Sequence, residues 1–155
     1  MEASKKVDVS VIVVSFNTKD FLRACLRKLS GEIIVVDNGS TDGSVEMIKK
    51  EFPSVTLLVN KINKGFAAAN NQGLKHAHGR YLLLVNSDTE VPQGSIEEVT
   101  RFMDDHPDIG VTGVKLMLPN GKMDPACHRG FPTPWAALTY FMGLEKTHLR
   151  IFSHY

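Results

Sequence analysis

Apolar runs of strand length alternate with segments of helical periodicity along the first two thirds of the chain. The first run, VSVIVVSF at residues 9–16, is apolar on both alternating faces, which is typical of a strand buried on both sides. The next segment, KDFLRACLRKL at residues 19–29, has apolar side chains at three- and four-residue intervals and predicts a helix. Asn17, Thr18 or Asp20 can cap the N-terminus of this helix.

The same alternation continues towards the C-terminus. Further strands are predicted at residues 33–36, 55–59, 81–85 and 109–114, and further helices at residues 45–52, 66–78 and 95–105. Strands and helices that alternate through short connections predict right-handed βαβ units, and therefore an α/β fold with a mainly parallel sheet flanked by helices. Beyond these elements, KLMLPNGKMD predicts a hairpin around Pro119, Asn120 and Gly121, and residues 135–144 predict a short apolar helix.

Composition narrows the class of protein. The chain has 155 residues, which predicts a single domain over residues 1–155, and its 43% hydrophobic content suits a globular core. A net charge of +1 gives no electrostatic basis for a nucleic-acid partner. Cys25 and Cys127 form no C-x-x-C motif, and no signal core or membrane-spanning run is present. We therefore expect a cytoplasmic protein, with peripheral attachment to the inner face of a membrane as the alternative.

Polar residues gather after the predicted strands. They are Ser15 and Asn17 after the first strand, residues 37–42 after the second, residues 60–65 after the third, and residues 87–90 after the fourth. The carboxyl ends of parallel strands meet at one edge of a sheet, where ligands bind in the crevice. These four loops are therefore predicted to form one site.

The residue types in these loops favour a phosphorylated ligand with a cation. The dinucleotide motif G-x-G-x-x-G and the P-loop are both absent. A carboxylate at a strand end, Asp88, suits Mg²⁺ or Mn²⁺ held together with substrate phosphates. Asp37 suits a base N–H or a ribose hydroxyl, because an ionised carboxylate only accepts hydrogen bonds. The structural alternatives are an Asx-turn at Asp37, a cap or turn role for Asp88, and a helix cap at Asp42.

Four segments together resemble a known family. VSVIVVSFNTKDFLRACL, IIVVDNGSTDGS, NKGFAAANNQGL and YLLLVNSDTEV are similar, in this order and spacing, to the nucleotide-sugar-binding part of the inverting glycosyltransferases of family 2, above all the rhamnosyltransferase-like branch. The resemblance covers about residues 9–143 and implies a GT-A fold, a Rossmann-like nucleotide-diphospho-sugar transferase architecture. It also implies transfer of a hexose from a dTDP- or UDP-sugar to a glycan or lipid-linked acceptor, Mg²⁺ or Mn²⁺ as cofactor, and a place in cell-wall or polysaccharide biosynthesis.

The resemblance also assigns roles to individual residues. Those assigned to the nucleotide-sugar are Val14, Phe16 and Asn17 at the base, Asp37 and Asn38 at the base and ribose, Asn63, Gly65 and Asn70 on the phosphate side, and Ser87. It assigns the metal to Asp88, with Asn86 and Ser87 beside it.

Two departures from the family pattern bear on activity. Asn38 and Asn86 stand where the family often has acidic residues, which leaves Asp88 as the one predicted carboxylate ligand. The family's general base lies downstream of Tyr155, and Asp124 is the nearest substitute, so the catalytic residue is not identified. We therefore expect a donor-binding part of a GT-A domain that is incomplete at its C-terminus.

Other functions are compatible with the same residues. The chain could be a nucleotide-sugar-binding module without transferase activity, or a folded fragment without a ligand. A nucleotidyltransferase would normally have a Gly-rich loop with Arg and Lys after the first strand, and residues 15–20 contain none. The apolar stripe of Trp135, Phe141 and Leu144 predicts either core packing or self-association.

Overall fold

The computed structural model describes residues 8–118, 120–124, 127, 134–135, 138 and 142. The chain divides into two compact units, residues 1–105 and residues 106–155. The first unit contains all the helices and strands that position the candidate site.

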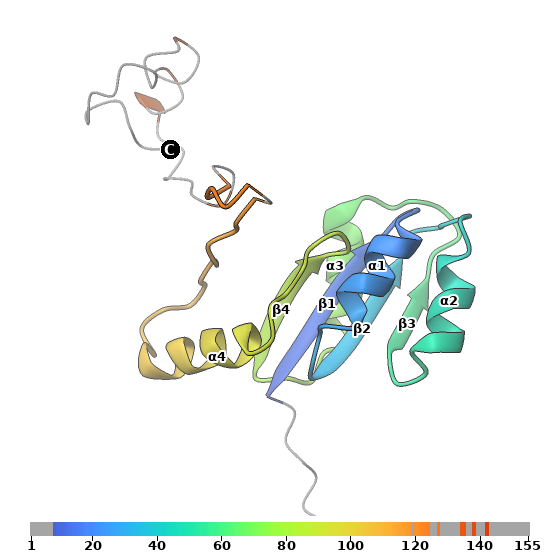
Figure 1. Ribbon diagram of the computed structural model, residues 1–155, viewed down its shortest axis with the longest axis horizontal. Coiled ribbons are helices and arrows are strands. Elements are labelled where there is room, and N and C mark those ends of the chain that lie inside the picture. Colours follow the sequence, from blue (N-terminus) through green and yellow to red (C-terminus); the bar gives the residue numbers. More distant parts are fainter. Residues whose placement is uncertain are drawn as a thin grey trace, which may run out of the picture. The chain divides into compact units, whose positions relative to one another are not determined.

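A parallel sheet forms the centre of the first unit (Figure 1). Its strands are β1 (Val9–Ser15), β2 (Glu32–Asp37), β3 (Thr56–Val59) and β4 (Tyr81–Asn86), in the order β3-β2-β1-β4. In the register of this sheet Ser15 lies opposite Asp37, and Val14 lies opposite Asn86. The ends of β1, β2 and β4 therefore reach the same edge, and the loops that follow them start side by side.

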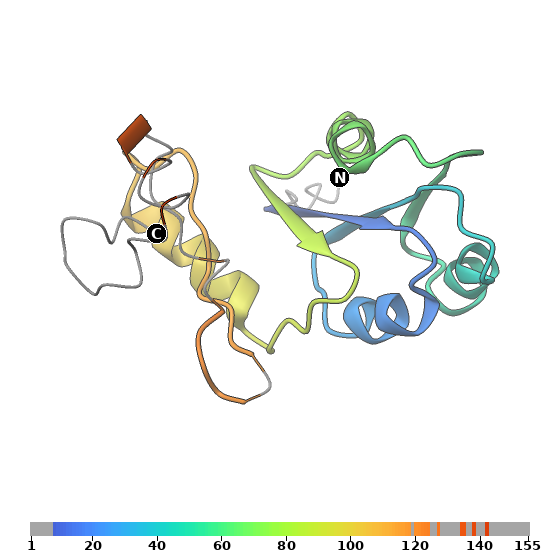
Figure 2. The same cartoon turned by 90° about the horizontal axis from the view of Figure 1, so that it is seen from above.

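Helices cover both faces of the sheet. Helices α1 (Lys19–Leu26) and α2 (Ser44–Glu51) lie on one face, and α3 (Phe66–Leu74) lies on the other (Figure 2). Helix α4 (Ser95–Asp105) follows β4. The main core cluster lies between the sheet and the first two helices and includes Val11, Val13, Leu22, Cys25, Val35, Met47 and Ile48. Because β1 and β2 are central and buried on both faces, their sequences are continuously apolar rather than alternating.

Helix α3 approaches the sheet closely at Gly73. A Cβ atom on Gly73 would lie 2.6 Å from Ile12 Cγ2 and 3.2 Å from Val36 Cγ2. Any larger residue would force the helix and the sheet apart. The close approach explains why a glycine stands in the interior of this helix despite its low helix propensity.

The predicted α/β fold is confirmed, although two helices are shorter than predicted. Helix α1 ends at Leu26 because the next two turns tighten, with Lys28 N–H donating to Cys25 O and Leu29 N–H to Leu26 O. Helix α3 likewise ends at Leu74 instead of residue 78.

The prediction of a fifth strand at residues 109–114 is wrong. These residues are described without strand structure, and Val111 is 91% exposed. A strand needs a paired neighbour, and two glycines, Gly110 and Gly113, weaken this segment further. Apolar composition alone therefore overestimated its tendency to pair.

The predicted hairpin turn is confirmed in the described residues. Met117 and Met123 form an antiparallel bridge, and Gly121 N–H donates to Leu118 O over 2.9 Å. Pro119 lies outside the described residues, as do Phe141, Leu144 and most of the predicted helix at 135–144. Within the described part of the chain, no helix is long and apolar enough to span a membrane.

Candidate functional site

An open pocket of about 290 Å³ lies at the carboxyl edge of the sheet. Its lining residues are Val14, Phe16, Thr18, Asn38, Asn63, Phe66, Asn86, Ser87 and Asp88. Seven of these were predicted for a ligand or metal site, and the loops after β1, β2, β3 and β4 all contribute. Thr18 and Phe66 also line the pocket but were not predicted as ligand-binding residues.

Asn17 supports the pocket without lining it. Its backbone adopts a left-handed conformation with φ of 53°, which asparagine tolerates better than most residues. Its side-chain Oδ1 accepts a hydrogen bond from Thr41 N–H over 2.8 Å, and its N–H donates to Ser40 Oγ over 2.9 Å. Asn17 therefore joins the loop after β1 to the loop after β2.

Asn38 organises the loop after β3. This side chain is buried, and its Nδ2 donates to Asn63 Oδ1 over 2.9 Å and to Gly65 O over 3.3 Å. Its Oδ1 accepts hydrogen bonds from Asn60 Nδ2 and from Lys64 N–H. Every polar group of the amide is used, and a carboxylate at this position could not donate the first two bonds. This explains in structural terms why asparagine follows Asp37 here.

Gly65 and Asn70 set the start of helix α3. Gly65 precedes the helix with φ of 84°, a conformation that favours glycine. Asn70 Nδ2 donates to Phe66 O over 3.0 Å, one helical turn back. Neither residue lines the pocket, but together they hold the turn that presents Phe66 to it.

Asp37 is the last residue of β2 and is fully buried. Its Oδ1 accepts hydrogen bonds from Gly39 N–H over 3.1 Å and from Ser40 N–H over 2.9 Å, so the Asx-turn alternative is realised. Its other oxygen, Oδ2, is buried and has no hydrogen-bond partner in the described part of the chain. Such an atom is costly to bury, so it marks a position where a donor from outside the chain would be favourable.

Asp88 lies in a tight turn after β4. Thr89 N–H donates to Asn86 O over 3.1 Å, which closes the turn at residues 86–89. Cys25 Sγ lies 3.8 Å from the same carbonyl oxygen and donates to it. Burial, together with the negative charge of Asp88, raises the pKa of the Cys25 thiol to about 11. The thiol is therefore a neutral donor beneath the turn.

A chain of hydroxyl groups connects this turn to the end of β1. Ser15 Oγ lies 3.0 Å from Thr18 Oγ1, and Thr18 Oγ1 donates to Ser87 Oγ over 2.9 Å. Ser15 and Ser87 are buried, so these contacts are sheltered from water. The loop after β1 and the turn that presents Asp88 are thus held at a fixed spacing.

The pocket suits a hard divalent cation only with help from a ligand. Among the described residues, Asp88 is the one carboxylate that lines it, with amide and hydroxyl oxygens of Asn86 and Ser87 beside it. No cluster of three or more His, Cys, Asp or Glu side chains able to hold a metal occurs among the described residues. Mg²⁺ is typically bound by one or two carboxylates together with substrate phosphates, and this donor set fits that arrangement.

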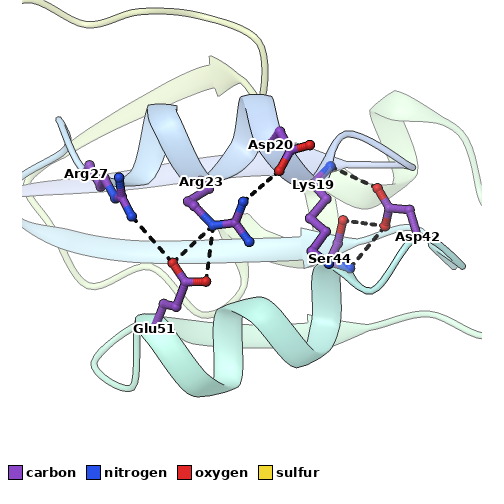
Figure 3. A network of polar contacts seen from close by, with 7 residues as sticks. All are labelled: Lys19, Asp20, Arg23, Arg27, Asp42, Ser44 and Glu51. Atoms are coloured by element: carbon purple, nitrogen blue, oxygen red, sulfur yellow. Dashed lines mark hydrogen bonds and ion pairs between the residues drawn. The ribbon is translucent and has the colours of Figure 1, made fainter.

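Asp42 caps two helices at once (Figure 3). Its Oδ1 accepts hydrogen bonds from Ser44 N–H and Ser44 Oγ at the start of α2, and its Oδ2 accepts one from Lys19 N–H at the start of α1. Burial raises the pKa of Asp42, but these hydrogen bonds outweigh it and leave the pKa below its usual value. The helix-cap prediction for Asp42 is confirmed and extends to a second helix. Further along, Arg23 pairs with Glu51 over 3.0 Å, which joins α1 to α2.

A second polar cluster lies at the opposite, amino edge of the sheet. Ser10 Oγ donates to Glu32 Oε2 and accepts hydrogen bonds from His78 N–H over 3.1 Å and Gly79 N–H over 2.7 Å. His78 Nδ1 donates to Glu32 Oε1 over 2.7 Å. A Cβ on Gly79 would lie 2.5 Å from Ser10 N, so only glycine fits there. This cluster ties the connection between α3 and β4 to β1 and β2.

The arrangement of sheet, helices and pocket is that of a GT-A transferase fold. The crystal structure of S. aureus TarS 1-349 in complex with UDP is 25% identical, with a TM-score of 0.56, over 74% of this chain and 43% of that chain. The mannosyltransferase PcManGT from Pyrobaculum calidifontis, in complex with GDP-Man and Mn²⁺, is 21% identical with a TM-score of 0.60. The latter match covers 76% of this chain and 37% of that chain.

The sequence places the chain in a family within this fold. The sequence profile of glycosyl transferase family 2 matches residues 10–148, so the chain belongs to that family. The minor teichoic acid biosynthesis protein GgaB of Bacillus subtilis (strain 168) is 30% identical over 134 residues, which are 78% of this chain and 15% of GgaB. The chain spans between 14% and 26% of the length of GgaB and two other curated relatives. The family resemblance predicted from the four segments is therefore confirmed.

Proposed function

We propose that this chain forms the donor-binding part of a metal-dependent, inverting glycosyltransferase. It binds a dTDP- or UDP-sugar, and the sugar passes to a glycan or lipid-linked acceptor. The proposal rests on one observation. The same pocket is lined by the Asp88 turn and by aromatic and amide side chains from three other loops. A nucleoside diphosphate needs both halves of such a lining, one for the base and one for the phosphates.

The base end of the ligand is assigned to the aromatic part of the pocket. Phe16 and Phe66 are 46% and 58% exposed, large fractions for phenylalanines, and both line the pocket beside Val14. A planar base that covered these rings would remove apolar surface from water. Asp37 is fully buried and does not line the pocket, but its Oδ2 is an acceptor without a partner in the described residues, and we assign it to a base N–H or a ribose hydroxyl.

The phosphate end is assigned to the Asp88 turn on electrostatic grounds. The described lining contains one carboxylate, Asp88, and no lysine or arginine. A diphosphate beside Asp88 would be repelled unless a cation lay between them. Mg²⁺ or Mn²⁺ held by Asp88 would supply that charge and would stabilise the departing diphosphate during transfer.

Solved structures and relatives support this assignment from outside the chain. S. aureus TarS 1-349 was crystallised with UDP, and PcManGT with GDP-Man and Mn²⁺. GgaB is named as a protein of minor teichoic acid biosynthesis. A role in the synthesis of a cell-wall or related polysaccharide is consistent with these matches.

A second candidate function is a binding module that transfers nothing. Inverting transfer needs a general base near the acceptor hydroxyl, and no carboxylate other than Asp88 lines the pocket in the described residues. Asp124 belongs to the second unit, where its N–H donates to Leu116 O. Release of free sugar from the donor, or its transfer to an added acceptor, would exclude this candidate.

Thermal unfolding with UDP, dTDP and GDP, each with and without Mn²⁺, tests the proposal. A ligand at 100 times its Kd should stabilise the fold by about 2.7 kcal/mol, a rise in Tm of roughly 5–11 °C for a domain of this size. We expect one nucleotide to produce a Mn²⁺-dependent shift that Asp88→Ala abolishes. Glu90→Ala removes a nearby exposed carboxylate outside the pocket lining and should leave the shift intact. The absence of any shift in the unmodified chain would overturn the proposal.

A further inference from the structure

The turn that presents Asp88 is attached to helix α1 at two points. Thr18, the residue before α1, donates its hydroxyl hydrogen to Ser87 Oγ over 2.9 Å. Cys25, in the last turn of the helix, donates to Asn86 O over 3.8 Å. Ser87 and Asn86 are consecutive residues of the turn, so α1 fixes both its backbone and the Ser87 side chain.

The first of these attachments has a direction. Each hydroxyl donates one hydrogen and can accept two. Thr18 gives its hydrogen to Ser87, so the 3.0 Å contact between Thr18 and Ser15 requires Ser15 to be the donor. The hydrogen of the Ser87 hydroxyl then has no acceptor in the described part of the chain. Ser15, Thr18 and Ser87 thus form a chain of hydrogen bonds, and the hydroxyl hydrogen of Ser87 is the donor left unused at its end.

The position of Ser87 indicates which acceptor it would meet. Ser87 is only 8% exposed, and the space beside it is the pocket that it lines together with Asp88. The described lining contains no lysine or arginine, so neutral donors must supply the contacts to an anionic ligand that a cation does not supply. A hydroxyl that already accepts from Thr18 is a better donor, because hydrogen bonds in a chain polarise one another.

We propose that Thr18 is a positioning residue that directs the Ser87 hydroxyl hydrogen onto an oxygen of the donor's diphosphate. This inference rests on the proposed function, because it assumes that a nucleoside diphosphate occupies the pocket. Ser87 touches the ligand, and Thr18 acts through Ser87. The role distinguishes Ser87 from its neighbour Asp88, which takes the cation.

The affinity for a nucleoside diphosphate relative to its parent nucleoside tests this inference. Isothermal titrations of the full 155-residue chain with UDP and uridine, dTDP and thymidine, and GDP and guanosine identify the pair to be used. Thr18→Val and Ser87→Ala should each weaken diphosphate binding roughly tenfold, the effect of losing one hydrogen bond to a charged group, and should leave nucleoside binding unchanged. Thr18→Ser keeps the hydroxyl and should restore the diphosphate affinity.

Two further variants separate this role from a general structural one. The double variant Thr18→Val with Ser87→Ala should bind the diphosphate no more weakly than either single variant, because both remove the same hydrogen bond. Thr89→Val removes a hydroxyl from the same turn, but one outside the pocket lining, and should change nothing. Additive losses, or equal losses for diphosphate and nucleoside, would overturn the inference.

Amide exchange tests the positioning step without any ligand. Thr89 N–H closes the turn on Asn86 O, so its exchange rate reports on the order of the turn. Thr18→Val should speed this exchange severalfold, and Thr18→Ser should not. If the unmodified chain binds no diphosphate, the proposed function fails. If binding is normal but unchanged by Thr18→Val, only this inference fails.

Discussion

The two edges of the sheet use polar residues in opposite ways. At the amino edge Ser10, Glu32, His78 and Gly79 satisfy one another through hydrogen bonds. At the carboxyl edge the network stops short, and Asp37 Oδ2 has no partner in the described part of the chain. Polar networks whose groups are all satisfied make a fold rigid, whereas a buried polar atom without a partner is costly and would gain from a ligand that supplies one. The comparison predicts that substitutions at the amino edge change stability, and that substitutions in the pocket lining change binding.

Ser10→Ala should have the largest effect. Ser10 is buried, and its hydroxyl both accepts a hydrogen bond from Gly79 N–H and donates one to Glu32. The substitution removes both bonds. We expect a loss of about 2–3 kcal/mol in the free energy of unfolding, since unsatisfied buried groups cost about 1–3 kcal/mol each. Urea unfolding measures this loss, and nucleotide affinity below the transition should be unchanged. Ser54→Ala, at an exposed position, is the matched control, and equal stability of the two variants would contradict the prediction.

Asp42→Ala is a stricter test of the comparison between the two edges. Asp42 lies in the loop after β2, at the carboxyl edge, yet its contacts stabilise the fold. Its carboxylate caps the starts of both α1 and α2. Loss of two caps at about 1 kcal/mol each should destabilise the protein by about 2 kcal/mol. Asp42→Asn keeps one acceptor oxygen, which can serve only one of the two helix starts, so this variant should recover about half of that loss. Asp20→Ala is the control, because the Asp20 side chain is 87% exposed and its salt bridge to Arg23 therefore contributes little. Weaker nucleotide binding by folded Asp42→Ala would show that this residue belongs to the site.

Glu32→Gln should give a smaller, pH-dependent effect. Burial raises the pKa of Glu32, but hydrogen bonds from Ser10 and His78 outweigh it and hold the pKa below its ordinary value of 4.5. A carboxyl group with a depressed pKa adds stability above the unfolded pKa and loses it as the pH falls through the folded pKa. The variant should be less stable by about 1 kcal/mol at pH 7, the worth of a hydrogen bond. The difference should shrink steadily below pH 4.5.

Thermal unfolding between pH 3 and pH 7 measures this difference. Glu46→Gln changes an exposed carboxylate on α2 in the same way and is the control. A difference between wild type and Glu32→Gln that stays constant with pH would contradict the assigned hydrogen bonds.

Phe66→Leu should have the smallest effect, and only on binding. Its ring is 58% exposed and lines the pocket, so its replacement removes surface for a base to cover. We expect a roughly fivefold weaker nucleotide affinity, which corresponds to about 1 kcal/mol of aromatic contact, with unfolding unchanged. Phe21→Leu changes a comparably exposed phenylalanine outside this pocket and should bind normally. Equal binding by both variants would argue against a base beside Phe66.

Strands that are buried on both faces were predictable from the sequence, because their residues are continuously apolar. Residues 9–16 and 33–36 are continuously apolar, and β1 and β2 agree with them to within one residue at each end. The segment at residues 109–114 has a similar composition but forms no strand. Strand formation depends on a pairing partner, and local composition carries no information about that partner.

The site was predictable where a residue's role follows from its place at a strand end. Asn86, Ser87 and Asp88 follow β4 directly, and the parallel topology brings them to the pocket. Thr18 was predicted only as a helix cap, and its hydroxyl instead contacts Ser87, which is 69 residues away in the chain. Contacts of this kind arise from the packing of α1 against the end of β4. A hydroxyl residue just before a helix is a weak sequence signal for a contact of this kind.

Gly73 has a consequence for evolution of the pocket. The absence of a side chain there lets α3 lie against Ile12 and Val36, and Phe66 stands at the other end of the same helix. A methyl group at Gly73 would move the helix outward and would carry Phe66 with it, although Gly73 touches no part of the pocket. Relatives with alanine or serine at this position should therefore have a wider pocket mouth. A residue two helical turns from Phe66 would then limit which bases fit.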